Sequence, residues 1–286
     1  MNLSKITTKF SSTHPFFSGI NTKIVQVAAS KLNIPLHLIR VEYSDTVSGS
    51  NSRETAASIT SENIGQAVWN CCSTLNKRLE PIRNSLDKNA SWATIVNTAW
   101  ERNVNLIANE QVVLGDLSDY VCHGLALSEV KVDLLTGVNQ ILRVDILEDV
   151  GISISPNIDI GQIEGAFVMG LGYWLTEELI YDRSTGQLLT NRTWNYKPPN
   201  SMDIPIDFRV EMLQDSSNPR GFLNAKTTGE PATCLAVSVI FAIQQALQSA
   251  RKDAGLKREW VRLGAPTTTE VIIQNSGATL EQFVLE

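Results

Sequence analysis

The sequence predicts a mixed α/β domain of the α+β class. Segments with apolar residues at helical spacing are interleaved with shorter segments in which apolar and polar residues alternate, as in a strand. They do not follow a strict strand–helix–strand rhythm, and no predicted strand leads through a Gly-x-Gly-x-x-Gly turn into a helix. Gly170 and Gly172 fall inside a predicted helix instead. The pattern therefore gives little support to a dinucleotide-binding fold.

Five helices are predicted, and the chain supplies stop and start signals for several of them. They cover residues 22–32, 61–83, 91–102, 159–179 and 232–251. Pro35 is expected to end the first helix, Pro81 lies near the end of the second, and Pro266 marks the start of one more short helix. Three glycines in the fourth helix each cost roughly 1 kcal/mol relative to alanine. They indicate that something approaches this backbone closely.

The predicted strands are short and include one hairpin. They cover residues 38–43, 121–133, 140–148 and 208–213. The turn signal Thr136-Gly137 joins the second strand to the third. Residues 44–60 are rich in Ser, Thr, Asn and Gly, and we expect a loop that is long enough to be functional.

Composition limits the classes of function. The 286-residue chain is 43% apolar, which is typical of a globular protein, and its formal net charge of −6 argues against nucleic acid as a partner. Its four cysteines form no paired motif and indicate free thiols in a reducing compartment. The N-terminus has no signal-peptide pattern, and the longest apolar run, 165–175, is too short to cross a bilayer. We expect a soluble cytoplasmic protein with no membrane partner.

Most of the common catalytic patterns are absent from the sequence. The three histidines are scattered, and neither a His-Glu-x-x-His nor a Gly-x-Ser-x-Gly motif occurs. Two segments remain as candidates. Gln162 follows Gly161 near the start of a glycine-bearing helix, where its amide can bind a ligand or simply face water. Glu230 stands between Gly229 and Pro231, where a carboxylate can cap the helix or act as a base.

Taken together, the segments of the chain resemble the molybdenum-cofactor domain of the xanthine dehydrogenase and aldehyde oxidase family. The matching stretches follow the order of that family from residue 19 to the end of the chain. They are Gly19-Ile-Asn-Thr-Lys23, Gly65-Gln-Ala-Val68, Asp149-Val-Gly151, Gly161-Gln-Ile-Glu-Gly-Ala-Phe167, Thr176-Glu-Glu-Leu179, Tyr196-Lys-Pro198, Ile204-Pro205, Phe208-Arg-Val210 and Lys226-Thr-Thr-Gly-Glu-Pro231.

The resemblance implies a cofactor, molybdenum bound to molybdopterin, and a role for each matching residue. Glu230 matches the general base of the family, and Gln162 matches a glutamine that hydrogen-bonds the pterin. Ala57, Ser58 and Thr60 lie where the family has a loop around the cofactor, and the residue matching Ala57 lies beside the metal. In such chemistry the cofactor carries out the redox step and the protein orients the reactants.

The resemblance also implies a reaction, the hydroxylation of an aldehyde or N-heterocycle carbon with oxygen derived from water. The sequence of residues 167–174 and 192–196 resembles aldehyde oxidases more closely than xanthine dehydrogenases. A xanthine dehydrogenase-like substrate remains the alternative, because the residues that discriminate the two lie mainly in parts that this chain lacks.

Residues 1–18 do not match, so we divide the chain into this segment and a molybdopterin-binding domain over 19–286. Ser18 stands where the family has a cofactor-binding glutamine. One hypothesis is that Pro15-Phe-Phe-Ser18 is translated from the pyrimidine-rich tract before a splice acceptor. The first 18 residues would then be a gene-model artefact.

The resemblance covers only the C-terminal portion of the molybdenum domain. FAD and 2Fe–2S centres are expected of the whole enzyme, but this chain has neither binding domain, and it lacks the cysteine clusters of an iron–sulfur site. We therefore expect it to be incomplete for turnover. It would act as a homodimer or with a chain that supplies the missing domains. A different reading is a truncated, non-catalytic fragment that binds only the cofactor or a partner.

Overall fold

The computed structural model describes residues 6–8, 19–42, 58–110, 120–256 and 260–278. The chain divides into two compact units, each assembled from separate segments. The first unit contains Met1–Tyr120, Gly151–Ile158 and Ser217–Lys226, and the second contains Val121–Val150, Asp159–Ser216 and Thr227–Glu286. Both contain helices and strands, which confirms the predicted mixed class.

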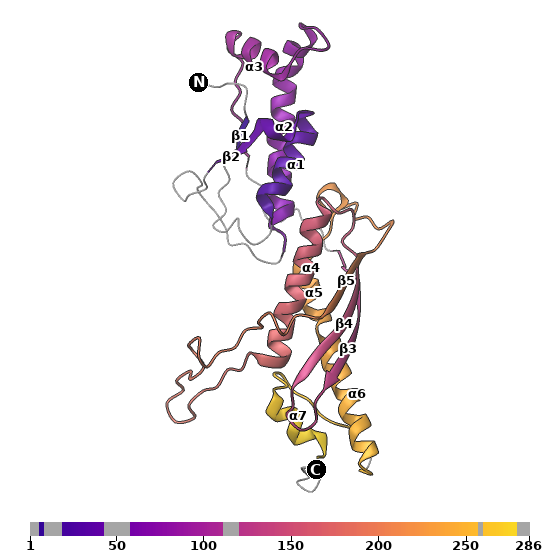
Figure 1. Ribbon diagram of the computed structural model, residues 1–286. Helices are drawn as coiled ribbons and strands as arrows, with labels where there is room; N and C mark the ends of the chain where they lie inside the picture. The colour runs from indigo at the N-terminus through magenta and orange to yellow at the C-terminus, as the bar shows by residue number, and fades with distance from the viewer. Residues whose placement is uncertain (1–5, 9–18, 43–57, 111–119, 257–259, 279–286) are drawn as a thin grey trace. The chain divides into compact units, whose positions relative to one another are not determined.

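The first unit is mainly helical. Its elements are a short parallel pair of strands, β1 (Ile6–Thr8) and β2 (Ile39–Val41), and three helices, α1 (Ile20–Leu32), α2 (Thr60–Asn84) and α3 (Trp92–Glu101). α1 packs against α2 around a buried cluster that includes Ile24 and Val68 (Figure 1). Ser91 caps α3 by accepting a hydrogen bond from the Thr94 N–H at 3.1 Å. The strand β1 lies within residues 1–18, for which the sequence predicts no helix or strand.

Two predicted helix ends in this unit agree with the structure to within one residue. α2 runs to Asn84, one residue beyond the predicted bound and past Pro81, and its Ile82 belongs to a buried cluster with Leu79 on the same helix. α1 ends at Leu32, as predicted, and its C-cap residue Asn33 adopts a left-handed conformation, so the helix stops before Pro35. The predicted loop over 44–60 lies mostly outside the described residues, and its last residue, Thr60, begins α2.

The second unit is built on a three-stranded sheet in the order β3-β4-β5. β3 (Gly124–Val132) and β4 (Asn139–Glu148) form the predicted antiparallel hairpin, and β5 (Asp207–Met212) lies parallel to β4. Gly137 has a φ of 70°, a conformation that favours glycine and fits the predicted turn.

One face of this sheet is covered by helices (Figure 1). They are α4 (Pro156–Leu171), which continues as a single π-helical turn (Gly172–Thr176), α5 (Gly229–Leu235), α6 (Val237–Asp253) and α7 (Thr269–Ser276). Side chains from the sheet, such as Val144 and Ile146, pack with Phe167 of α4 and Ile243 of α6 into one core. Sequence patterning therefore finds the right helices in this unit, and α7 confirms the start signal at Pro266.

Two helix bounds differ from the prediction. The helix expected over 159–179 widens at Gly172, whose backbone lies against Glu177 and Pro199, and it ends at Thr176. The helix expected over 232–251 is two helices that meet at Ala236, a fully buried residue that keeps helical backbone angles.

The combined stretch Gly229–Asp253 is long and apolar enough to cross a membrane by length and composition alone, which the longest apolar run did not indicate. Val239, Ile243 and Leu247 on this stretch are fully buried in the core of the second unit. A helix that supplies core side chains passes the same test, so the stretch is weak evidence for a membrane span.

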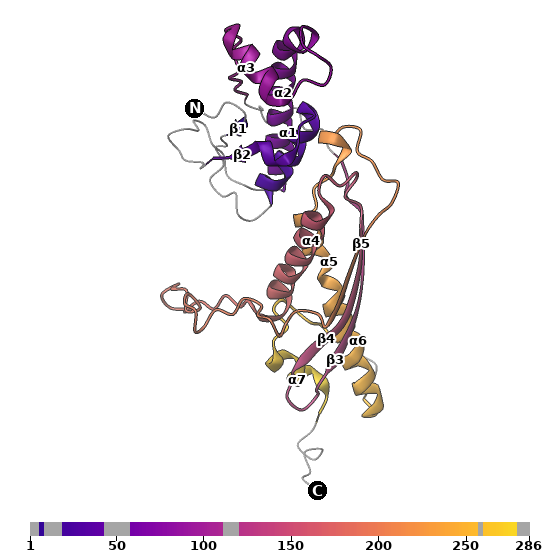
Figure 2. The same ribbon diagram turned by 45° about the horizontal axis from the view of Figure 1, so that its top comes forward.

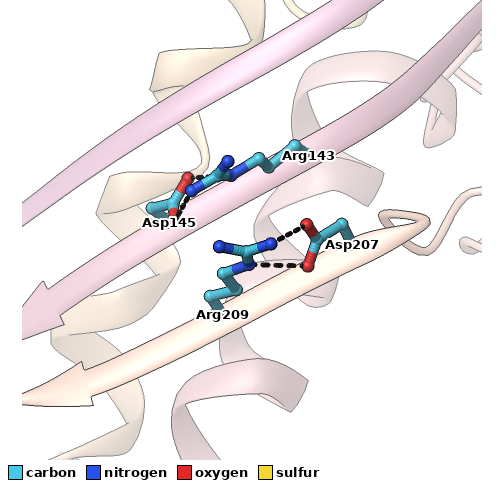
Figure 3. Close-up of polar contacts among 4 residues, drawn as sticks. All are labelled: Arg143, Asp145, Asp207 and Arg209. Carbon is cyan, nitrogen blue, oxygen red and sulfur yellow. Dashed lines mark hydrogen bonds and ion pairs between the residues drawn. The ribbon is translucent and has the colours of Figure 1, made fainter.

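The other face of the sheet carries charged side chains in alternating register. Arg143 binds Asp145 through two hydrogen bonds of 2.6 and 2.8 Å, and Arg209 binds Asp207 through two of 2.9 and 2.6 Å. Arg143 lies opposite Asp207, and Asp145 lies opposite Arg209, so each charge has opposite charges beside it (Figure 3). These pairs are exposed to solvent, and we expect them to add little stability.

Between Thr176 and β5 the chain leaves the body of the second unit as a long arm, residues 177–206, which extends from it in both views (Figures 1 and 2). Within the arm, an antiparallel bridge joins Tyr181 to Leu188, and the Tyr196 hydroxyl donates a hydrogen bond to Glu177 at 2.8 Å. Its exposed apolar side chains include Trp194, which is 90% exposed, and Met202, which is 79% exposed. Large exposed apolar side chains in one segment are typical of surfaces that contact other proteins.

Candidate cofactor site

Glu230 lies in the first turn of α5, with its side chain exposed. The N-cap residue of this helix is Thr228, and no side chain caps it. Glu230 is therefore not the N-cap residue, and Pro231 is the third residue of the helix where the sequence predicted the first. The arrangement presents the carboxylate to solvent rather than to the core.

α5 is held in direct contact with α4. A Cβ atom added to Gly170 of α4 would lie 2.5 Å from the carbonyl oxygen of Thr233 and 2.7 Å from the Cβ of Ala236. Only glycine permits so close an approach, which confirms that one of the three predicted glycines serves backbone contact. Thr233 lies three residues after Glu230, so this contact fixes the helix that carries the carboxylate.

The segment that precedes α5 is held by the buried amide of Asn218 within the first unit. Its Nδ2 donates a hydrogen bond to the carbonyl oxygen of Ala225 at 3.0 Å, and Ala225 also forms a bridge with Gly151. Leu223 and Asn224 between them both adopt positive φ values, 50° and 62°. A left-handed leucine is strained and persists only where the surrounding structure over-determines it.

Gln162 lies on α4 at the edge of an uncovered face. Its side chain is half-buried, and the neighbouring Gly161 and Gly165, one turn apart, have nothing within 4 Å of an added Cβ atom. Met169, one turn further along, is 71% exposed. The opposite face carries fully buried residues such as Phe167. The bare backbone beside Gln162 leaves room for a flat ligand to approach.

Ser58 and Thr60 lie at the start of α2 in the first unit. Ser58 has a positive φ of 52°, and Thr60, the first residue of the helix, is buried. The nearby Glu62 accepts a hydrogen bond from the Tyr120 hydroxyl at 3.3 Å, and burial raises the pKa of this carboxyl above its usual range. A long helix whose first turn follows a turn with a left-handed residue suits an anionic ligand, because its first N–H groups have no helical partner. Ala57, predicted to lie beside the metal, is outside the described residues.

Of the predicted site residues, Gln162 and Glu230 therefore lie on two helices that pack against each other in the second unit. Ser58 and Thr60 belong to the first unit. In the described part of the chain, no three His, Cys, Asp or Glu side chains are arranged to hold a metal ion. All four cysteines are free thiols, as predicted. Burial raises the pKa of the Cys72 thiol to about 11, so it is a packing residue and not a nucleophile.

Comparison with known proteins identifies the family. A family model described as the molybdopterin cofactor-binding domain matches residues 9–205. The chain belongs to this family. Curated relatives include xanthine dehydrogenase/oxidase of Gallus gallus, 41% identical over 89% of this chain, and aldehyde oxidase 3 of Mus musculus, 40% identical over 89%. The resemblance and the molybdopterin cofactor class are thereby confirmed.

Solved structures support the same fold. Quinoline 2-oxidoreductase from Pseudomonas putida 86 matches 96% of this chain and 37% of its own with a TM-score of 0.76 at 23% identity. Aldehyde oxidoreductase from Desulfovibrio gigas matches 91% of this chain and 28% of its own with a TM-score of 0.70 at 20% identity. The chain spans about a fifth of the length of the curated relatives it matches, 19% and 20% for the two above.

Sequence reasoning missed three residues around the site. Asn218 could have been found through the turn signal Asn218-Pro219, although its buried hydrogen bond could not. Gly151 was noted only as part of a stretch that matches the family. The structure shows that its backbone lies against Asn224, because an added Cβ atom would lie 2.4 Å from the carbonyl oxygen of that residue. Glu148 carried no signal, because a charged residue at a strand end is ordinarily exposed.

Proposed function

We propose that this chain is the C-terminal cofactor-binding portion, over residues 19–286, of a molybdenum-dependent oxidoreductase that resembles aldehyde oxidase. The reaction would be the hydroxylation of an aldehyde or N-heterocycle carbon with oxygen derived from water. The observation that carries the proposal is the position of Glu230: an exposed carboxylate in the first turn of α5, on a helix locked to the helix of Gln162 through Gly170.

The residues of the chain fit the cofactor in two ways. The open backbone at Gly161 and Gly165 would accept the pterin beside the amide of Gln162, which would donate a hydrogen bond to it. Ser58 and Thr60, with Ala57, would line the cofactor from the start of α2, where the N–H groups of a first helical turn suit a phosphate. When bound, the cofactor would supply the redox chemistry.

Glu230 would hold and move the proton. Its exposure leaves the carboxylate accessible to a substrate, as a general base requires. The contact at Gly170 would keep it in place, because a misplaced base loses much of its effect.

The substrate would be a small molecule, and the relatives support two classes equally. Identities of 41% to a xanthine dehydrogenase/oxidase and 40% to an aldehyde oxidase do not separate them. We favour the aldehyde oxidase-like class because of the sequence of residues 167–174, and a xanthine dehydrogenase-like substrate is the alternative.

A companion polypeptide would complete the enzyme, or the chain would act as a homodimer. The exposed apolar side chains of the arm, among them Trp194 and Met202, support this. The companion would bring the FAD and 2Fe–2S centres and the first half of the molybdenum domain. We place the protein in the cytoplasm, in keeping with its free thiols.

A second candidate function rests on the same arm. If no companion chain exists, the exposed apolar surface favours a non-catalytic protein that binds the cofactor or a partner. Co-purification with flavin and iron–sulfur subunits supports the enzyme, and a purified chain that binds molybdopterin but recruits no such subunit supports the second candidate.

The catalytic role is tested by Glu230→Gln in the assembled enzyme, with Glu211→Gln as a matched control on the exposed face of β5. We expect turnover to fall by at least a hundredfold (about 2.7 kcal/mol) while molybdenum and pterin contents stay unchanged. A loss below about tenfold would show that Glu230 is not the base. A loss of cofactor with the activity would assign Glu230 to binding instead.

A further inference from the structure

A second carboxylate of this unit, Glu148, lies where a charge is costly. It is the last residue of β4, and its side chain shares the inner face of the sheet with Val144 and Ile146. The residue is 0% exposed. Among the described residues, neither Oε1 nor Oε2 has a hydrogen-bond partner. A buried carboxylate without a partner is strongly disfavoured in its ionised form.

The charged groups that face Glu148 are also acidic. They are Asp149, the next residue, and Asp159 on α4, which are 5% and 3% exposed. Asp149 accepts a hydrogen bond from the Ser216 hydroxyl, and its N–H donates to the carbonyl oxygen of His123 at 2.8 Å.

The neighbouring strands bring no charged side chain against Glu148. Its register partners are Gly124 on β3 and Met212 on β5. The side chain of His123, just before β3, is exposed, and the contact that α5 makes at this end of the sheet is that of Leu235 with Gly124. No three of the described acidic, His or Cys side chains are arranged to hold a metal ion, so we treat the three acids as a proton site.

These acids flank three of the five points at which the chain passes from one unit to the other. The chain leaves the second unit after Val150, returns to it at Asp159, and leaves it again after Ser216. Glu148 and Asp149 stand directly before the first of these points, Asp159 at the second and Ser216 at the third. A charge that appears at Glu148 therefore acts on the segments of the second unit that adjoin these three points.

We propose that Glu148 is a proton-dependent catch that holds the end of β4, the turn at Asp149 and the start of the buried part of α4 together only while its carboxyl is neutral. Burial, followed by the charges of Asp149 and Asp159, raises the pKa of Glu148 to about 8 from 4.5. The folded chain thus keeps a proton at neutral pH that the unfolded chain releases. Its stabilising effect is complete below pH 4.5, declines as the pH rises, and is lost once the pH has passed about 8.

The test compares the 286-residue chain with Glu148→Gln, a neutral side chain of the same shape, and with Glu211→Gln as a matched control on the exposed face. Urea unfolding is measured between pH 5 and 9.5, together with amide hydrogen exchange over residues 149–159. Relative to Glu148→Gln, we expect the folding constant of the wild type to fall by up to about tenfold per pH unit below pH 8. After correction for the intrinsic exchange rate at each pH, the protection of residues 149–159 should fall with rising pH in the wild type and in Glu211→Gln but not in Glu148→Gln.

Parallel pH curves for the wild type and Glu148→Gln would overturn the proposal. If Glu148→Gln does not fold, carbon-13 NMR of labelled glutamate in the wild type decides instead: a buried carboxyl that titrates near 8 supports the catch. A Glu148 carboxyl that titrates near 4.5 would overturn it. Neither readout depends on cofactor binding, so failure of the catch and failure of the proposed reaction remain distinguishable.

Discussion

The two faces of α4 differ in what their glycines do. On one face Gly170 lies against the backbone of α5, and an added Cβ atom would lie 2.5 Å from the Thr233 oxygen. On the other face Gly161 and Gly165 border open space beside Gln162. Glycine spacing in a sequence therefore does not reveal whether a helix approaches another helix or leaves room for a ligand. Substitutions along this one helix can separate the two roles.

The largest loss of stability is expected at the packed face. Phe167 is fully buried, and its ring lies 5.4 Å from that of Phe208. Phe167→Ala should lower the free energy of unfolding by about 3–5 kcal/mol. Met169→Ala, two residues away and largely exposed, should change it by less than about 0.5 kcal/mol. Urea unfolding of both variants checks this, and equal losses would show that the faces are not distinct.

Gly170→Ala should lower the free energy of unfolding by about 1–3 kcal/mol, because the added methyl group overlaps the backbone of α5. The same substitution at Gly165 meets nothing within 4 Å. Gly165→Ala should therefore raise stability by about 0.5–1 kcal/mol, the usual gain in a helix interior. Thermal unfolding of the matched pair measures the difference, and a stabilising Gly170→Ala would disprove the close contact.

The smallest effect on stability, with a clear effect on binding, is expected at Gln162. Gln162→Ala should change the free energy of unfolding by less than about 0.5 kcal/mol, since the side chain is only half-buried. Loss of its amide should nevertheless reduce the molybdenum and pterin retained after purification. Met169→Ala serves as the control, and equal cofactor contents in the two variants would remove Gln162 from the proposed site.

Much of the fold follows from the sequence, and the exceptions have physical reasons. Periodicity predicts the hairpin of β3 and β4, and helical spacing predicts α4 and the single stretch that forms α5 and α6, whereas α7 is indicated by the start signal at Pro266. The division of that stretch into α5 and α6 occurs at the buried Ala236, where neither Gly nor Pro marks it in the sequence. The burial of Glu148 depends on which face of β4 packs against the helices. Only the folded sheet shows that Asp145 lies on the outer face and Glu148 on the face that meets the core.

The candidate site was predictable in part. The sequence singles out Gln162 and Glu230, and the two helices that carry them lie in contact. The hydrogen bond of Asn218 to Ala225 joins residues seven apart in an irregular segment, where no periodicity exists to reveal it. The left-handed conformation of Leu223 is equally invisible, because leucine rarely adopts it.

The most direct test of the central claim is the molybdenum and pterin content of the purified 286-residue chain, by elemental analysis and by fluorescence of the released pterin. The account predicts one molybdenum and one pterin per folded chain, reduced in Gln162→Ala and unchanged in Glu230→Gln. Well-folded protein that carries neither molybdenum nor pterin would contradict it.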